Sequence, residues 1–237
     1  MHSWVWDSVA SRIAVEKAIE IDPQNPDAWI HAMWHYIDVR NFEMAENRRV
    51  DLNKGRFAYD DDGLSILFTS GKIEQVIKLL KNTDSETAGW GASFFGELSF
   101  LRLGNFEKSI AWLEDAVKQD PNNISLMPPL IFAYKQDGQL NLADQLMKEM
   151  QDASKYRHII NFHYAELAMI NNEVDKAFEY LGKSLQNHEL YIHRINWYSY
   201  FDPLNDDPRM ISIMERSWTP LDMASTLEKC IAQNKKS

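Results

Sequence analysis

A period of 34 residues runs through the second half of this sequence. Gly104, Gly138 and Asn172 are spaced 34 residues apart, and four further columns of residues keep the same register. The first members of those columns are Phe100, Phe106, Ser109 and Leu113. A repeat of this length indicates that one small unit recurs and buries its apolar face against its neighbours. The period therefore limits the fold to an array of stacked units.

Each unit is predicted to contain two helices separated by a sharp turn. Apolar residues recur at helical spacing on both sides of Gly104, and a glycine at such a break favours a left-handed end to the first helix. Asp120-Pro121 predicts the end of a second helix, because proline disfavours helical geometry in the residue before it. Pro128-Pro129 predicts that the following helix begins late, with a proline in its first turn.

The period extends toward the N-terminus, where Ser11 and Ala45 keep the 34-residue spacing. The third unit, marked by Gly71 and Val76, is predicted to be shorter, and the first unit lacks room for its first helix. Residues 4–6 are Trp-Val-Trp, whereas the end of a helical array usually carries a polar cap. These residues pack over the first helix, or the chain is a fragment of a longer protein. We favour the fragment, because exposed apolar ends promote aggregation.

The composition argues against several classes of function. The chain carries 25 Lys+Arg against 35 Asp+Glu, a net charge of −10, whereas a nucleic-acid surface needs clustered basic residues. Its single cysteine, Cys230, excludes an internal disulfide and a cysteine-based zinc site. The longest nearly apolar run, residues 126–134, is too short to span a bilayer. We therefore expect a cytoplasmic protein whose partners here are neither nucleic acids nor membranes.

These features resemble the tetratricopeptide repeat (TPR) family, whose unit also has 34 residues. The resemblance covers residues 1–190 and rests on large, small and proline residues at the family's packing positions. The large residues are Trp29, Tyr36, Phe100 and Tyr134; the small ones are Ala18, Ala45, Ala116, Ala143 and Ala177; the prolines are Pro23 and Pro121. Met33 and Glu97 depart from the pattern, because the family places a small residue there. The resemblance implies an all-α fold: a right-handed α-solenoid of helix-turn-helix units with a C-terminal helical cap over residues 191–237.

A second resemblance lies after the repeats. Residues 202–210, Asp-Pro-Leu-Asn-Asp-Asp-Pro-Arg-Met, are similar to the ending of TPR regions in certain bacterial signalling proteins, with Met210 in place of the usual phenylalanine. In those proteins the repeats follow a DNA-binding, adenylate-cyclase or kinase module. The likeness implies a regulatory or sensing region of a larger signalling or transcription-control protein. Pro208 is predicted to start a helix that covers the last repeat, and Pro220 to start a final helix at 221–232.

In the TPR family the first helix of each unit lines a concave groove, which binds proteins or peptides. Carried over to this chain, the groove positions are mostly apolar and aromatic, the usual anchors of binding surfaces. The residues predicted to bind a partner are Ile30, Trp34, Phe94, Leu98, Leu101, Arg102, Phe132, Lys135, Phe162 and Glu166. We expect the ligand to be an apolar or extended peptide, or a partner helix. No three consecutive units supply the set with which TPR co-chaperones grip a terminal carboxylate. One alternative stays open: the aromatic stretch at 191–201 of the same chain fills the groove.

Catalytic and metal-binding patterns are weak. His31 and His35 are four residues apart on a predicted helix and are able to meet one metal ion, but two ligands do not make a site. The acidic run at 60–62 before Gly63 fails the EF-hand spacing and is better explained as favourable charge near a helix start. Nucleophile and phosphate-loop motifs are absent from the sequence. We expect no enzyme and no cofactor; the alternatives are a self-associating module, such as a homodimer, a small-ligand sensor, and a metal enzyme using the two histidines.

Overall fold

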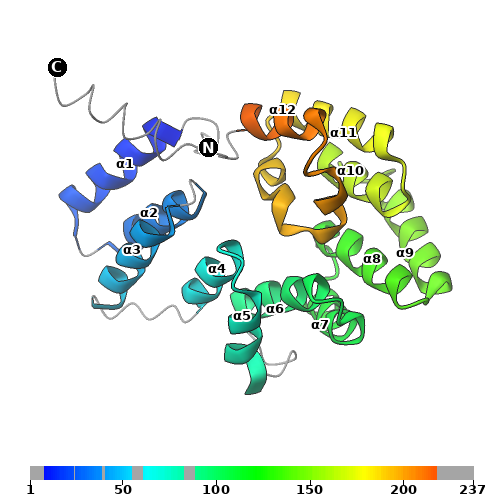
Figure 1. Cartoon of the computed structure of the whole chain (residues 1–237), viewed down its shortest axis with the longest axis horizontal. Coiled ribbons are helices and arrows are strands. Elements are labelled where there is room, and N and C mark those ends of the chain that lie inside the picture. The colour runs from blue at the N-terminus through cyan, green and yellow to red at the C-terminus, as the bar shows by residue number, and fades with distance from the viewer. Residues whose placement is uncertain (1–7, 24, 39–40, 55–60, 83–88, 218–237) are drawn as a thin grey trace. The chain divides into compact units, whose positions relative to one another are not determined.

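The computed structural model describes residues 8–23, 25–38, 41–54, 61–82 and 89–217. Helices and turns account for this part of the chain, and no strand occurs within it (Figure 1). The all-α prediction is therefore confirmed over the described ranges. The chain divides into two compact units, residues 1–71 with 214–237 and residues 72–213, and each is considered by itself.

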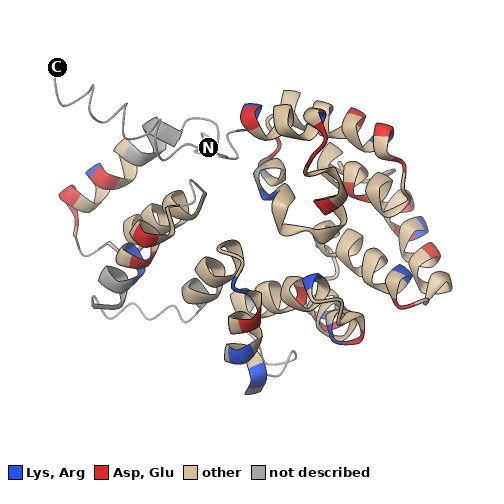
Figure 2. Cartoon of the chain, in the orientation of Figure 1, with Lys and Arg blue, Asp and Glu red and all other residues tan. Residues whose placement is uncertain are grey.

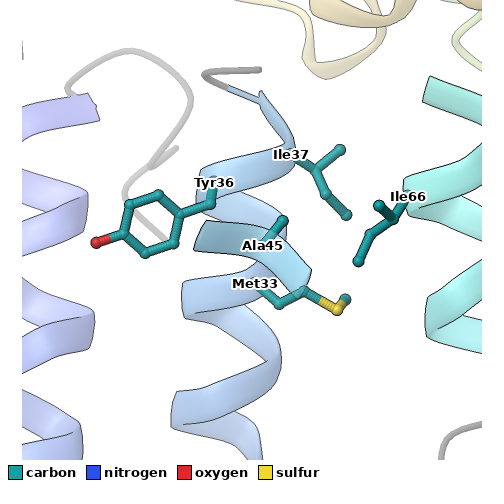
Figure 3. Packing of buried hydrophobic residues seen from close by; sticks show 5 residues of the cluster. All are labelled: Met33, Tyr36, Ile37, Ala45 and Ile66. Atoms are coloured by element: carbon teal, nitrogen blue, oxygen red, sulfur yellow. The ribbon is translucent and has the colours of Figure 1, made fainter. Parts of the chain in front are cut away.

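The first unit is built from helices that contact one another in sequence order: α1 with α2, α2 with α3, and α3 with α4. The helices are α1 (Ser8–Ile21), α2 (Pro26–Asp38), α3 (Phe42–Lys54) and α4 (Asp61–Thr69). Their core contains Met33, Tyr36, Ile37, Ala45 and Ile66. Figure 3 shows Tyr36 pointing toward α1, while Met33 and Ile37 point toward Ile66 on α4. Residues of α2 thus join the helices on both sides of it.

The second unit consists of helix pairs followed by a short irregular stretch. The pairs are α6 (Trp90–Arg102) with α7 (Phe106–Gln119), α8 (Met127–Gln136) with α9 (Leu140–Ala153), and α10 (Asn161–Ile170) with α11 (Val174–Gln186). Around them lie α5 (Ile73–Leu79), η1 (Leu80–Asn82), η2 (Ile124–Leu126), η3 (Leu190–Trp197), η4 (Ser199–Leu204) and residues 208–213 of α12 (Pro208–Arg216). Contacts also join one pair to the next, α7 to α8 and α8 to α10. Each pair therefore packs on the next in sequence.

The turn inside each pair has the left-handed backbone predicted from the sequence. Gly104, Gly138 and Asn172 have φ angles of 69°, 79° and 59°. Glycine adopts this conformation without steric penalty, and asparagine tolerates it better than most residues. In each turn, the N–H of the residue after the left-handed one donates to the carbonyl five residues earlier: Asn105 to Phe100 (2.9 Å), Gln139 to Tyr134 (2.8 Å) and Glu173 to Ala168 (2.8 Å). These Schellman bonds satisfy carbonyl groups that the helix end would leave unpaired.

Five members of the small-residue column are fully buried: Ala45, Val76, Ser109, Ala143 and Ala177. They lie in the first turn or two of α3, α5, α7, α9 and α11. Residues that recur with the 34-residue spacing therefore also share the same buried position in these helices.

The proline predictions at Asp120-Pro121 and Pro128-Pro129 are also confirmed. Helix α7 ends at Gln119, immediately before Asp120-Pro121. Helix α8 begins at Met127 and carries Pro128 and Pro129 in its first turn, where their missing N–H groups break no helical hydrogen bond. Helix α4 begins at Asp61, so part of the acidic run lies at a helix start as expected.

Helix α12 contacts α11 through Arg209, which belongs to the Asp207-Pro208-Arg209 sequence. The backbone N–H and the guanidinium of Arg209 donate to the Asp207 carboxylate, and the guanidinium also reaches Asp175 of α11 at 2.7 Å. It lies over the Phe178 ring of the same helix, 3.9 Å from the centroid. The hydrogen bonds from Arg209 lower the pKa of Asp207. This part of the motif thus has a structural role in the second unit.

A partly buried tyrosine–glutamate hydrogen bond occurs in both units. The Tyr36 hydroxyl donates to Glu16 at 2.9 Å, and the Tyr134 hydroxyl donates to Glu114 at 2.7 Å. In both cases the tyrosine lies on the first helix of a pair and the glutamate on the helix before it. The bond therefore links consecutive pairs.

Tyr134→Phe is expected to lower the free energy of unfolding by about 1 kcal/mol, because it removes this bond and leaves the packing of the ring unchanged. Urea unfolding followed by circular dichroism measures the change. The matched control is Tyr156→Phe, since Tyr156 is 90% exposed. A change at Tyr134 no larger than that of the control would show that the bond contributes nothing.

Some expectations fall outside the described residues. These are the Trp-Val-Trp stretch at 4–6, Asp60, the final helix at 221–232 and Cys230. Among the helices that the structure does describe, none combines the length and the apolar character needed to cross a bilayer.

Candidate functional site

Residues 190–204, the return segment, lie against the first helices of three successive pairs in the second unit (Figure 1). The ring of Trp197 lies 5.8 Å from that of Phe94 on α6, measured between centroids. Tyr200 lies 5.2 Å from Phe132 on α8. We call the surface formed here by α6, α8 and α10 the inner surface. The alternative left open by the sequence is the arrangement observed: the chain's own aromatic stretch covers or contacts the predicted groove residues of this unit except Lys135.

Within the three helix pairs of this unit, the second helices carry most of the charged residues. Acidic and basic residues are intermixed along α7, α9 and α11 (Figure 2). By contrast, α8 has one charged residue, Lys135, and α10 has one, Glu166. This division matches the packing, because the first helices face the return segment while the second helices face outward.

The return segment is held largely by apolar burial. Its buried side chains have at most 9% exposure: Ile192, Ile195, Trp197, Tyr198, Tyr200, Phe201 and Leu204. On the inner surface, Phe162 is fully buried, and its ring lies within 6.2 Å of the rings of Tyr191, Tyr198 and Phe201. Aromatic side chains bury large apolar areas, so this contact supplies most of the attraction.

Arg102, at the end of α6, makes the main polar contact with the return segment. Its guanidinium donates to the backbone carbonyls of Asn196 and Trp197, the latter at 3.2 Å. It also donates to both carboxylate oxygens of Asp202, at 3.2 and 3.3 Å. A guanidinium presents several donors in a fixed plane, which suits simultaneous contact with main-chain and carboxylate oxygens. One side chain thus fixes two points of the segment.

A buried carboxylate, Glu166, lies at the α10 end of the inner surface. Its Oε1 accepts a hydrogen bond from the Tyr200 hydroxyl at 2.5 Å, and its Oε2 lies 2.6 Å from Nδ1 of His163. Burial, together with the charge of Glu166, raises the pKa of Tyr200 well above its usual range. The phenol therefore stays protonated and keeps its role as a donor.

A second buried carboxylate, Glu97 on α6, lacks such support. Its side chain is 2% exposed, and its Oε2 has no hydrogen-bond partner in the described part of the chain. Burial raises the pKa of Glu97 well above its usual range. Its charge acts on Tyr198 and Tyr200 of the return segment, where it helps to raise the pKa of both phenols. Glu97 is one of the two departures from the family pattern, and here it occupies the covered interior.

A carboxylate just before the return segment accepts hydrogen bonds from the start of a helix. Glu189, the residue before this segment, accepts hydrogen bonds from the backbone N–H groups of Asn161 and Phe162, at 3.0 and 2.9 Å, at the start of α10. Burial disfavours the charge of this carboxylate, but the hydrogen bonds from Asn161 and Phe162 outweigh it and lower the pKa of Glu189. A carboxylate here also meets the positive end of the helix dipole.

The structure places the predicted partner-binding residues in three settings. Those buried in the second unit are Leu98, Leu101, Phe162 and Glu166. Those half-buried and in contact with the return segment are Phe94, Arg102 and Phe132. The remaining three residues form the third group. Lys135 donates to Asn171 at 2.6 Å. Ile30 and Trp34 are half-buried on α2 of the first unit, where Trp34 packs against the core. In this state a partner would have to displace the return segment to reach the first two groups.

Two features of the site were not anticipated from the sequence. The ring of Trp112 on α7 fills the space beside Gly96 on α6, and Trp197 and Tyr200 supply the anchors of the return segment. For the anchors, the only sequence signal was an aromatic run beginning where the period ends. For Gly96 and Trp112, the signal was a glycine in a helix interior, which usually indicates close packing.

The histidine pair does not gather further ligands. His31 is exposed and His35 is 3% exposed. Within the described ranges, no group of three or more His, Cys, Asp or Glu residues is placed to hold a metal ion.

Comparison with protein-family models, with curated proteins and with solved structures gave no match to this chain.

Proposed function

We propose that this chain is a TPR-type α-solenoid whose function is to bind another protein or a peptide. The helix pairs, their left-handed turns in register and the buried small-residue column support the repeat architecture. One observation supports the proposed binding function. A stretch of chain outside the repeat lies across the first helices of three successive pairs, and Arg102 holds its main chain. A surface that accepts a peptide chain in this way is suited to accept one from a partner.

The biological setting is a further part of this proposal. The resemblance of residues 202–210 to the ending of bacterial signalling TPR regions supports a regulatory or sensing role within a cytoplasmic signalling or transcription-control protein. The gene region upstream of the first codon tests this point. A DNA-binding, cyclase or kinase module encoded there in frame would support the setting, and an unrelated module would contradict it.

Peptide selection on the full chain tests the binding function. We expect a displayed peptide library to yield a consensus peptide with micromolar affinity, measured by fluorescence polarisation. Ile30→Glu is expected to weaken at least tenfold the binding of a peptide that contacts the first unit, and Lys135→Glu that of a peptide that contacts the second, because each places a repelling charge among the predicted contacts. The control is Lys148→Glu, which makes the same charge change as Lys135→Glu but on an exposed position of α9. Failure to obtain a consensus, or binding indifferent to both changes, would contradict the proposal.

Self-association is a second candidate, favoured by one observation. Helix α1 exposes two large apolar side chains, Ile13 at 57% and Ile21 at 75%. Light scattering after size exclusion is expected to show a dimer whose fraction rises with concentration and falls in the Ile13→Lys, Ile21→Lys variant. A monomer at all concentrations would eliminate this candidate.

A further inference from the structure

We propose that the return segment is a built-in competitor for the partner, and that it marks the partner as an aromatic peptide carrying an acidic residue. This inference rests on the proposed function and adds the chemistry of the ligand and the regulation of its access. The peptide chemistry is read from the segment itself, whose residues 197–202 are Trp-Tyr-Ser-Tyr-Phe-Asp.

The segment has the position of a ligand and not of a repeat. The 34-residue columns end before it begins, and its helical turns are of the 3-10 type, which has poorer hydrogen-bond geometry than the α-helix. Its ring contacts and its hydrogen bonds to Arg102 and Glu166 fall on α6, α8 and α10, which are the first helices of their pairs. Contact with the same helix of successive repeats is how solenoid proteins hold an extended ligand.

The contacts define what a replacing peptide must supply. Aromatic rings are needed beside Phe94 and Phe132, where Trp197 and Tyr200 now lie. A carboxylate is needed for Arg102, which also binds any main chain through its carbonyl oxygens. A hydroxyl donor beside Glu166 completes the set, because that carboxylate is buried and accepts from Tyr200.

The occupied state also contains an uncompensated polar group. The Glu97 carboxyl is buried without a partner for Oε2, and burial of an unpaired polar atom is unfavourable. The charge of Glu97 acts on Tyr198 and Tyr200 of the return segment. The unpaired atom makes the described state less stable than its buried apolar area alone would give.

The covalent linkage of the return segment determines how tightly a partner must bind to replace it. The segment follows α11 after only residues 187–189, so its effective concentration at the inner surface is high, on the order of millimolar for a short connection. A weak external peptide is therefore excluded until the segment is loosened or the partner binds more tightly than the segment does. This gives the inner surface two states, covered and partner-bound.

The test uses the full chain with Trp197→Ala and Tyr200→Ala, which weaken the segment at its two anchors. The probe is a fluorescein-labelled peptide of residues 189–205 with the natural sequence. We expect it to bind this variant at least tenfold more tightly than it binds the natural chain. Adding Arg102→Ala to the variant is expected to remove that gain, and a peptide carrying Asp202→Asn is expected to bind more weakly. Absence of peptide binding to the folded variant would overturn the inference.

A second measurement covers the case in which the variant does not fold. Hydrogen exchange of the natural chain compares the amides of Tyr198 and Phe201, which donate within the return segment, with those of α8. Exchange of the segment through an opening that leaves α8 protected supports the inference. Exchange of both only through global unfolding would show that the segment is a permanent part of the core. In that case, the proposed function would still be supported if Ile30→Glu weakened the binding of peptides selected from the library.

Discussion

Gly96→Ala is expected to lower the free energy of unfolding by about 3 kcal/mol, at the upper end of the usual range for overpacking. A Cβ atom at this position would lie 2.3 Å from Cζ3 and 2.6 Å from Cε3 of Trp112. The indole has little freedom to move, because it is 7% exposed and lies edge-on to Phe100 at 5.6 Å between centroids. The methyl group therefore forces α6 and α7 apart.

The same substitution elsewhere provides the control. Gly182 lies inside α11, and a Cβ there would meet no atom within 4 Å. Gly182→Ala is expected to stabilise the chain by about 0.5–1 kcal/mol, because alanine has the higher helix propensity. Urea unfolding of both variants, followed by circular dichroism, gives the comparison. Equal changes of the same sign would refute the packing argument, whereas recovery of stability in Gly96→Ala, Trp112→Leu would strengthen it.

Glu97→Gln is expected to stabilise the chain at neutral pH and to flatten its stability profile. The folded state holds Glu97 with a raised pKa because of burial, whereas the unfolded state deprotonates it near its ordinary value. Between these two values the folded state binds the extra proton, so the natural chain loses stability as pH rises, by up to about 1.4 kcal/mol per pH unit. Glutamine has the shape of the neutral acid and does not titrate, so the variant escapes this loss.

The measurement is the difference in unfolding free energy between variant and natural chain from pH 4 upward. The difference is expected to be small at the acid end, to widen with increasing pH and to level off once Glu97 is ionised in the folded state. Glu107→Gln on the exposed side of α7 serves as the control and should track the natural chain. A Glu97→Gln difference that stays constant across this range would mean that burial does not hold the proton on Glu97.

The repeat itself was readable from the sequence because its physical requirements are local. A left-handed turn favours glycine or asparagine, and it occurs at Gly104 and Asn172 as expected. Close contact of two helices needs a small side chain, and Ala143 is fully buried there. Proline placement likewise fixed the end of α7 and the start of α8. Each of these signals is contained in one residue and its near neighbours.

The covering of the inner surface was not readable in the same way. Phe94 and Phe132 present the same spacing whether they face a partner or the chain's own Trp197 and Tyr200. Choosing between these possibilities requires the path of residues 190–204, which follow no period. Glu166 was expected to face a partner as an acid at one end of the groove; it is instead buried and holds Tyr200. The fit of Trp112 against Gly96 depends on two helices meeting, which no single window of sequence reports.

Arg102 binds carbonyl oxygens, which every amino acid possesses. Replacement of the Asn196 side chain would therefore leave this anchor intact. Loss or gain of one residue between Trp197 and Asp202 would carry the carboxylate out of reach of the guanidinium. Natural variants of this protein are thus constrained to keep the number of residues in this stretch more strictly than their identity.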